Sequence, residues 1–262
     1  MPSGPTDPRP SPARTEWLRG VTYAHRGLHG AGRVENSLGA FAGAVTAGLG
    51  IECDVQRSAD GRAVVFHDWD LDRLTGDSGP VAARTVAELT RVELRGAAET
   101  IPTLRDLLDL VARRVPLLIE LKSRREHPIS PLCRAVLRDL EGYPGPHAVM
   151  SFDPRVGHWF AGHSSETVRG LVISEANART FSASIKRRLA LWRARPDFLA
   201  YDVRDLPSRF AAAQRARGLP LLTWTVGTSA LRQRAMAQAD GWIAEGEGLA
   251  TAPTVVGGAG RP

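Results

Sequence analysis

Polar residues with the chemistry of a phosphoester-cleaving site recur in the first half of this 262-residue sequence, each near the end of an apolar run. They are His25-Arg26-Gly27, Glu35-Asn36, Glu52-Cys53-Asp54, His67-Asp68 and Glu120-Leu121-Lys122. Each group needs its own partner once it leaves water, so strand ends rarely collect this mixture for structural reasons. A metal-assisted site for a phosphate ester typically contains the groups present here, namely two imidazoles, three carboxylates and two cations.

The carboxylates have the spacing of metal ligands. Glu52 and Asp54 stand at positions i and i+2 of a strand-like run, so both point to one face while Cys53 points to the other. Glu120 and Lys122 repeat this spacing on a second run. Neighbouring carboxylates repel one another, and oxygen ligands favour a hard divalent cation, Mg²⁺ or Ca²⁺, with Mn²⁺ as a further candidate. The alternative is a solvated pair of carboxylates bonded to arginines.

Two histidines could supply acid–base catalysis. His25 and His67 each terminate an apolar run beside these carboxylates. Phosphodiester hydrolysis needs a base for the nucleophile and an acid for the leaving alkoxide, and imidazole titrates in the useful range. A lone histidine at a strand end is more often structural, but two beside a carboxylate cluster favour catalysis. The other histidines lack such context and are expected to be surface or structural residues: His29, His127, His147, His158 and His163.

Two cations could hold the phosphate. Arg26 directly follows His25 and suits clamping of phosphate oxygens, with a salt bridge at the rim as the alternative. Of the 34 basic residues only Lys122 and Lys186 are lysines, so the choice of a compact ammonium at position 122 indicates a requirement for it.

Four further residues are candidates for the substrate pocket. Glu35 and Asn36 precede the first expected helix, where Asn36 or Ser37 could instead be its N-cap. Phe152 and Trp224 end two apolar runs and could line an apolar wall, with core packing as the alternative.

Short strand-like runs alternate with helical segments along the chain, as in a parallel α/β protein. The sequence predicts eight strands over Val21–His25, Ile51–Val55, Leu117–Leu121, His147–Ser151, Val168–Ile173, Phe198–Tyr201, Leu221–Val226 and Gly241–Ala244. It predicts helices over Ser37–Gly48, Thr103–Arg114, Ser130–Leu140, Pro154–Gly162, Ser182–Ala194, Pro207–Arg217 and Thr228–Ala239, with a minor helix opened by a capping box at Thr85–Glu88.

One short run breaks the alternation. Residues 63–67 follow the second strand after a gap containing Asp60-Gly61, which is too short for a parallel crossover and typical of a hairpin. The expected fold is therefore an α/β TIM barrel, (β/α)8, with a β-hairpin inserted at the rim after strand 2 and its active site at the carboxyl ends of the strands. A doubly wound open sheet is the alternative.

Composition narrows the function classes. The net charge of +6 is spread along the chain and no nucleic-acid-binding motif occurs, so nucleic acid is not an expected partner. Two cysteines without disulfide spacing fit a reducing, cytoplasmic location. The sequence contains no run of about 18 apolar residues, so no membrane-spanning segment is expected. We expect a disordered tail over residues 1–16, one domain over 17–250 and a flexible tail over 251–262, while the oligomeric state has no sequence signal.

A basic amphipathic segment lies within the expected helix over 182–194. Ile185, Leu189 and Trp192 are set among Lys186 and several arginines. Such a helix usually packs its apolar face on a barrel as part of the outer layer, and the alternative is contact with an anionic membrane surface.

These motifs together resemble the glycerophosphodiester phosphodiesterase family. Its His-Arg-Gly, Glu-Asn, Glu-x-Asp, Asp-Gly into Val-Val-x-His-Asp, and Glu-x-Lys segments correspond to the residues quoted above, in the same order. Further similar segments are Leu71–Gly76, Ile101–Leu104, Ser151–Asp153 and Thr223–Val226, and the resemblance runs from about residue 21 to 245.

The resemblance implies a barrel, one divalent cation held by Glu52, Asp54 and Glu120, and His25 with His67 as the acid–base pair. It implies a small-molecule glycerophosphodiester substrate, hydrolysed to glycerol 3-phosphate and an alcohol, with its phosphate against Arg26 and Lys122. Alternatives are a lysophospholipase D-type lipid phosphodiesterase and a non-catalytic barrel that binds phosphate esters.

The sequence departs from the family pattern in two places. The stretch after His67 is short, so the small insertion domain of some members is expected to be missing. Where many members have an Ile-Thr-Asp-x-Pro-like run, this chain has Ile243-Ala244-Glu245-Gly246, which leaves the contribution of the last loop open.

Overall fold

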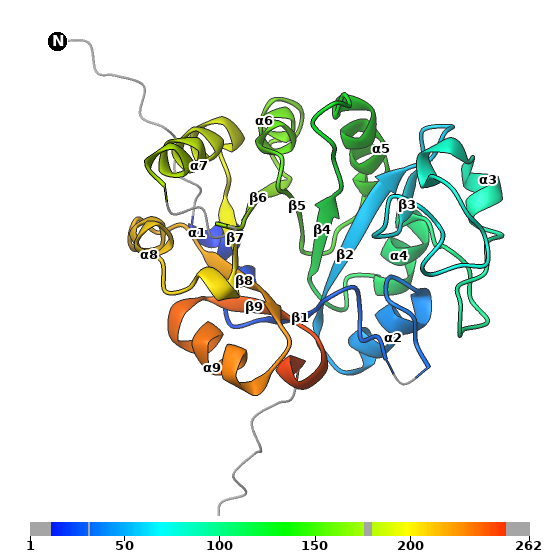
Figure 1. Cartoon of the computed structure of the whole chain (residues 1–262), viewed down its shortest axis with the longest axis horizontal. Helices are drawn as coiled ribbons and strands as arrows, with labels where there is room; N and C mark the ends of the chain where they lie inside the picture. The colour runs from blue at the N-terminus through cyan, green and yellow to red at the C-terminus, as the bar shows by residue number, and fades with distance from the viewer. Residues whose placement is uncertain (1–11, 31, 176–179, 250–262) are drawn as a thin grey trace, which may run out of the picture.

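The computed structural model describes residues 12–30, 32–175 and 180–249. Its strands form one sheet in the order β1-β9-β8-β7-β6-β5-β4-β2-β3, and a further pairing of β1 with β2 closes the sheet on itself (Figure 1). The eight strands of the closed ring are all parallel to their neighbours, so the fold is the expected (β/α)8 TIM barrel and an open doubly wound sheet is excluded. The strands are β1 (Thr22–Ala24), β2 (Gly50–Arg57), β3 (Ala63–Val65), β4 (Leu117–Leu121), β5 (His147–Ser151), β6 (Val168–Ile173), β7 (Phe198–Asp202), β8 (Leu221–Val226) and β9 (Gly241–Ala244).

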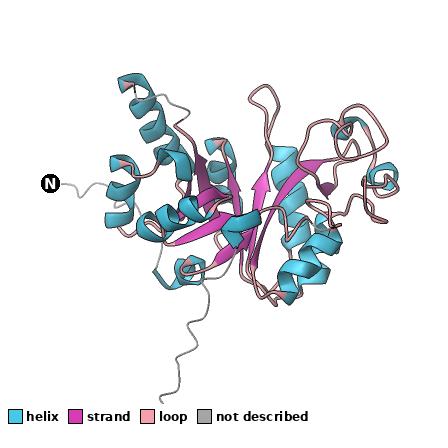
Figure 2. Ribbon diagram, turned by 60° about the horizontal axis from the view of Figure 1, so that its bottom comes forward, coloured by secondary structure: helices cyan, strands magenta, loops and turns pink. Residues whose placement is uncertain are grey.

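Helices surround this ring of strands (Figure 2). They are α1 (Pro12–Thr15), α2 (Leu38–Thr46), α3 (Val86–Leu89), α4 (Leu104–Val111), α5 (Ser130–Leu140), α6 (Pro154–His163), α7 (Phe181–Ala194), α8 (Arg209–Ala216) and α9 (Ser229–Gln238). Short 3-10 helices lie at Glu16–Leu18, Val81–Ala83, Val203–Asp205 and Gly246–Leu249.

The element boundaries differ from the expected ones by one to three residues, with local causes. The expected helix over Thr103–Arg114 ends at Val111 because Ala112 adopts a left-handed conformation with φ of 45°. The helix expected from Pro207 begins at Arg209, because the Ser208 side chain accepts a hydrogen bond from the Ala211 amide as its N-cap. The capping box at Thr85 and Glu88 is confirmed.

Strand pleating divides the core into two layers. Cys53 and Ile119 belong to the large apolar cluster beneath α2, α4, α5 and α6, whereas Leu118 belongs to the cluster inside the barrel. Because successive side chains alternate, Glu52 and Asp54 share the inward face of β2 while Cys53 faces outward, as the sequence predicts.

The hairpin after strand 2 is confirmed. At eight residues β2 is the longest strand of the described chain, and its end pairs with the antiparallel β3 outside the ring, with Val55 opposite Val65 and Arg57 opposite Ala63. The turn at its tip contains Gly61 with a φ of 80°, a conformation that glycine adopts without a side-chain clash. The returning arm then carries His67 back to the level of Asp54, where the Phe66 amide donates a hydrogen bond to the Asp54 carbonyl at 3.0 Å.

The connection that follows His67 is more than a simple loop. Residues 68–103 contain α3 and gather a small apolar core of their own with β3, which includes Phe66, Leu71, Val81 and Leu89. This stretch buries enough apolar side chains to pack as a separate layer beside β2 and β3 (Figure 1), and the expected lack of the small insertion domain of some family members stays a prediction.

The start of the described chain also differs from the expectation. Residues 12–16, expected as part of a disordered tail, include α1 and the first residue of the 3-10 helix at Glu16–Leu18. Arg14 anchors them by donating a hydrogen bond to the Thr167 carbonyl at 2.7 Å, and Leu18 is fully buried. Residues 1–11 and 250–262 lie outside the described residues, so the tails expected there stay predictions.

The apolar residues of α7 do not pack as expected. Ile185, Leu189 and Trp192 point away from the barrel, and the helix instead turns Ala190, Leu191 and Ala194 toward the strands. The two alanines on the inner face let the helix lie close to its neighbours, and Ile185, Leu189 and Trp192 remain outside. Among the described residues, no helix is long and apolar enough to cross a membrane.

Candidate active site

Three carboxylates converge inside the carboxyl end of the barrel. Glu52 and Asp54 come from β2 and Glu120 from the neighbouring β4, where Asp54 stands opposite Glu120 in the strand register. One carboxylate oxygen from each lies within 4.8 Å of the others. Glu52 and Asp54 are almost completely buried, at 1% and 2% exposure. The expected strand geometry therefore assembles the cluster that the spacing predicts.

Crowding changes the proton affinity of these carboxylates. Burial, reinforced by the charges of Asp54 and Glu120, raises the pKa of Glu52 well above its usual range. Burial and the charge of Asp54 likewise raise the pKa of Glu120 to about 7. Glu52 and Glu120 resist ionisation beside Asp54, so the cluster favours a positive charge among these residues. Because its donors are all carboxylate oxygens, the cluster fits a hard divalent cation such as Mg²⁺ or Ca²⁺.

Asn36 and Arg26 hold these carboxylates in place. Asn36 is buried and donates through Nδ2 to Asp54 Oδ2 at 3.0 Å, while its Oδ1 accepts from the Asp54 amide at 3.2 Å. The Arg26 amide donates to Glu52 Oε2 at 3.1 Å, and its guanidinium Nε lies 3.2 Å from Asp54 Oδ2. Asn36 is thus a positioning residue for a candidate ligand, and Ser37 rather than Asn36 is the N-cap of α2.

Lys122 lies against the same cluster. Its Nζ is 3.3 Å from Glu120 Oε1 and 3.5 Å from Asp54 Oδ1. Although burial alone would lower it, the charges of Glu120 and Asp54 raise the pKa of Lys122, so the ammonium stays charged. The structure therefore brings both predicted phosphate-binding cations, Arg26 and Lys122, to the three carboxylates.

His67 is held by a chain of ion pairs across the rim. Its Nδ1 lies 2.7 Å from Asp68 Oδ1, and Asp68 in turn accepts hydrogen bonds from Arg73. Arg73 also donates to Glu35, which accepts a further hydrogen bond from Arg26 at 2.7 Å. Hydrogen bonds from Arg73 lower the pKa of Asp68 to about 2, and burial lowers the pKa of His67. A neutral imidazole with Nδ1 bonded to a carboxylate leaves Nε2 free to accept a proton.

The Glu35 carboxylate links the guanidinium groups of Arg73 and Arg26. Although burial opposes ionisation, hydrogen bonds and charges from Arg73 and Arg26 lower the pKa of Glu35 to about 2. Because this carboxylate stays ionised and is occupied by two guanidiniums, it orients Arg26.

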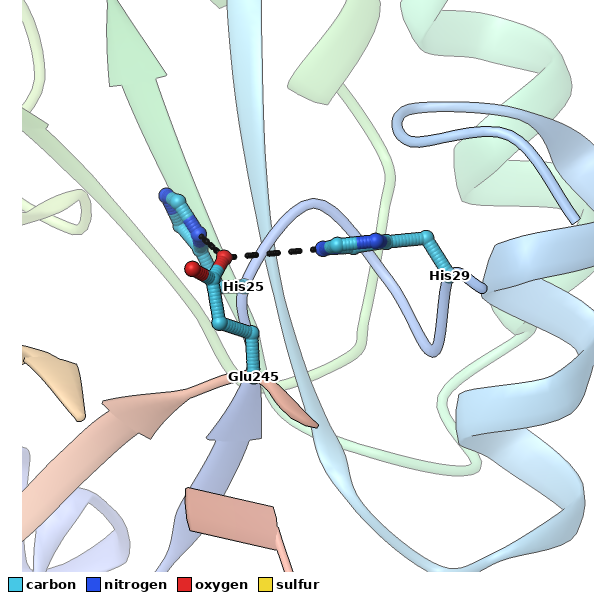
Figure 3. Close-up of side chains that lie close together, drawn as sticks. All are labelled: His25, His29 and Glu245. Carbon is cyan, nitrogen blue, oxygen red and sulfur yellow. Dashed lines mark hydrogen bonds and ion pairs between the residues drawn. The ribbon is translucent and has the colours of Figure 1, made fainter. Parts of the chain in front are cut away.

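His25 is bonded to a carboxylate from the other end of the chain. Its Nδ1 lies 2.6 Å from Glu245 Oε2, directly after β9, and His29 Nε2 lies 3.6 Å from the same oxygen (Figure 3). The hydrogen bond with His25 and the nearby His29 ring lower the pKa of Glu245 well below its usual range. The contact arises because β1 pairs with β9, and the His25 amide donates to the Ala244 carbonyl at 2.9 Å.

Phe152 and Trp224 form an aromatic pair at the carboxyl ends of β5 and β8. Their ring centroids are 5.3 Å apart in an edge-to-face arrangement with an angle of 85°. Phe152 is 48% exposed, so it is not a core residue, and Trp224 is fixed by a hydrogen bond from its Nε1 to the Ala200 carbonyl at 3.1 Å. The pair offers an apolar surface at the carboxyl end of the barrel.

Sequence reasoning missed Glu245, His29, Asp68 and Arg73. Asp68 and Arg73 carry little signal, because exposed charges near a rim are common. Glu245 had a readable signal: in a closed barrel the last strand pairs with the first, so a carboxylate after β9 must lie beside the residue that follows β1. His29, expected to be structural, is brought to that carboxylate by its i+4 spacing from His25.

Comparison with known proteins identifies relatives along most of the chain. A model of the "Glycerophosphoryl diester phosphodiesterase family" matches residues 25–246. A glycerophosphodiester phosphodiesterase of Bacillus altitudinis is 39% identical over 107 residues, covering 38% of this chain and 43% of that protein. The chain thus matches less than half the length of this and the next two such relatives.

Solved structures share the fold over nearly all of their length. A glycerophosphodiester phosphodiesterase from Thermotoga maritima is 27% identical with a TM-score of 0.69, covering 86% of this chain and 93% of that one. A phosphodiesterase from Oleispira antarctica, solved with sn-glycerol-3-phosphate, is 23% identical with a TM-score of 0.76, covering 88% and 94%. Because the family match includes every side chain of the site from His25 to Glu245, the chain belongs to the glycerophosphoryl diester phosphodiesterase family.

Proposed function

We propose that this chain is a metal-dependent phosphodiesterase that hydrolyses glycerophosphodiesters to glycerol 3-phosphate and an alcohol. The observation that carries the proposal is the buried trio Glu52, Asp54 and Glu120, whose oxygens lie within 4.8 Å of one another with two cations against them. Arg26 and Lys122 would bind the non-bridging phosphate oxygens. The membership of the family supports the substrate class.

The three carboxylates would hold one divalent cation, Mg²⁺, Ca²⁺ or Mn²⁺. A bound cation would polarise a phosphoryl oxygen and neutralise charge developing there. The chain's own residues then orient the substrate: Asn36 keeps Asp54 in place, and Glu35 directs Arg26.

His25 and His67 would act as the acid–base pair. One imidazole takes the proton of the nucleophile, which is the glycerol 2-hydroxyl or a water molecule, and the other donates a proton to the leaving alkoxide oxygen. Each has its Nδ1 bonded to a carboxylate, Glu245 for His25 and Asp68 for His67, so each presents Nε2 for proton transfer. Phe152 and Trp224 would contact the apolar part of the leaving alcohol. We also propose a cytoplasmic location, supported by the free, buried thiols of Cys53 and Cys133.

Release of glycerol 3-phosphate from a panel of glycerophosphodiesters tests this function. Activity should vanish with a chelator and return with one of Mg²⁺, Ca²⁺ or Mn²⁺. His25→Ala and His67→Ala should each lower kcat by about 10²–10⁴-fold, the usual contribution of a general acid or base. The matched control, His127→Ala at an exposed position, should be unaffected.

Two outcomes would contradict the proposal. Wild-type turnover in either histidine variant would remove the acid–base assignment. Substrate binding without turnover under every metal would leave the phosphate-ester-binding barrel, and preference for the acylated analogue of glycerophosphocholine in the same panel would favour the lysophospholipase D alternative.

A further inference from the structure

A stripe of large apolar side chains is exposed on α7. Ile185, Leu189 and Trp192 are 43%, 58% and 73% exposed. Their spacing of i, i+4 and i+7 places them within about 60° of one another around a helix. Exposed large apolar residues occur singly on most protein surfaces. A continuous stripe of them at helical spacing indicates a surface that contacts a membrane or another molecule.

Cations border this stripe on both sides. Helical geometry places Arg188 on one side and Lys186 with Arg193 on the other. All three are exposed, and α7 contains no acidic residue. Within the described residues, none of the three has a hydrogen bond or ion pair to a carboxylate. The positive charge of this face is therefore not neutralised by the protein itself.

An arginine-lined groove continues the surface toward α8. The groove has a volume of about 520 Å³, and its lining includes Arg188 from α7 together with Arg209 and Arg217 from and just after α8. Leu191 and Phe210 supply apolar lining. Neither Arg209 nor Arg217 forms a side-chain ion pair within the described part of the chain. The groove thus combines cationic and apolar lining. An anionic lipid has the matching chemistry, because its headgroup is negatively charged and its acyl chains are apolar.

We propose that α7 and the adjoining groove dock the protein on an anionic phospholipid membrane. Ile185, Leu189 and Trp192 insert among the headgroups and upper acyl chains, while the flanking cations contact lipid phosphates. Tryptophan is well suited to this depth because its ring is apolar and its N–H is polar.

A second copy of the chain fits this surface less well. In a two-fold symmetric contact the same patch meets itself, so the unneutralised cations of α7 would face those of the partner α7. Like charges that are brought together without counterions oppose association. An anionic bilayer supplies both the opposite charge and an apolar layer.

Flotation of the full-length chain with lipid vesicles tests the proposal. The protein should bind vesicles containing phosphatidylglycerol as about one third of the lipid, bind pure phosphatidylcholine vesicles much more weakly, and dissociate as salt is added. The double variant L189S/W192S should lower the partition coefficient by about tenfold or more, because two large apolar side chains no longer leave water. The double variant R188Q/R193Q should lower it by about fivefold for each cation removed.

Matched variants elsewhere on the surface separate docking from general charge and hydrophobicity. R91Q/R95Q removes the same charge near α3, and Met236→Ser removes an apolar side chain that is 59% exposed on α9. Both should stay within about twofold of wild type, because electrostatic attraction decays within a Debye length of the membrane. All variants should retain turnover of a soluble glycerophosphodiester, since none alters the candidate active site.

Three results would overturn the proposal. The first is an absence of vesicle binding by the wild-type chain. The second is an equal loss of binding in R91Q/R95Q, which would show that net charge alone is responsible. The third is a dimer in sedimentation experiments that becomes monomeric in L189S/W192S while vesicles remain unbound, which would assign the stripe to a second copy.

Discussion

Glu52 and Glu120 are costly to keep ionised beside Asp54 in this barrel without a cation among them. Only Arg26 and Lys122 provide positive charge at contact distance within the described residues, and both are also committed to other roles at the site. Burial, reinforced by the neighbouring negative charges, accordingly raises the pKa values of Glu52 and Glu120. At the scale of single residues, we therefore expect a divalent cation bound by these carboxylates to stabilise the folded protein.

Glu245 has a testable role at the same scale. If its carboxylate holds His25 in the orientation for proton transfer, Glu245→Gln should lower kcat by about tenfold or more with little change in KM, because an imidazole without its carboxylate partner loses both orientation and stabilisation. Steady-state kinetics on glycerophosphocholine measures this split. Glu245→Asp retains the charge and should recover part of the loss.

Glu247→Gln provides the control, since Glu247 is exposed on the neighbouring 3-10 helix. A change in KM alone, or equal losses in the glutamine and aspartate variants, would show that Glu245 does not orient His25 through its charge.

A tight turn after β1 places the segment that carries His25 and Arg26 against α2. Gly27 follows β1 with a φ of 80°, and a Cβ there would come within 2.9 Å of Ala40 and Phe41. This close approach, together with the Leu28 amide bonded to the Ala40 carbonyl at 2.9 Å, fixes the loop that carries His25 and Arg26.

Gly27→Ala should therefore reduce both stability and turnover. Gly30→Ala is a matched control, because Gly30 has a φ of 93° but a Cβ added there would have no atom within 4 Å. Both variants carry the backbone strain of a positive φ, but only Gly27→Ala adds a clash, which should cost about 1–3 kcal/mol more in the free energy of unfolding. Urea denaturation and kcat measure the two effects, and equal results for both variants would contradict this account.

Elements with strong local signals could be predicted from the sequence. The hairpin was readable from Asp60-Gly61 within a short gap, and the carboxylate spacing on β2 and β4 followed from the two-residue period of a strand. The contact between Glu245 and His25 could not be read locally, because it depends on closure of the barrel between β9 and β1. The orientation of α7 was also mispredicted, since Ala190, Leu191 and Ala194 rather than Ile185, Leu189 and Trp192 face the barrel.

The stability of the whole molecule should depend on pH through the same carboxylates. Glu120 has a pKa of about 7 in the fold, against about 4.3 when unfolded, so the folded state binds the extra proton between these values. Stability of the metal-free protein should therefore be greatest near pH 5 and fall as pH rises toward 8. The contribution of one such carboxylate is of order 1–3 kcal/mol.

Thermal unfolding in chelator checks this dependence. Glu120→Gln should raise the Tm at pH 8 and flatten the pH profile, with a shift of about 2–4 °C per kcal/mol for a protein of this size. A residual slope should remain because the pKa of Glu52 is also raised. Added Mg²⁺ or Ca²⁺ should stabilise the wild type much more than the variant.

Glu126→Gln removes an exposed carboxylate and should leave the profile unchanged. A wild-type Tm that instead rises between pH 5 and 8 in chelator would contradict the burial of unneutralised charge at this site.

The proposed reactive residues and the proposed pocket residues come from different parts of the sequence. Both proposed acid–base histidines, the three carboxylates and both proposed phosphate-binding cations occur between His25 and Lys122, whereas Phe152 follows β5 and Trp224 lies on β8. Directed evolution can use this division. A library confined to the loops after β5 to β8 should alter which alcohol the enzyme accepts, because it leaves the proposed reactive residues between His25 and Lys122 unchanged.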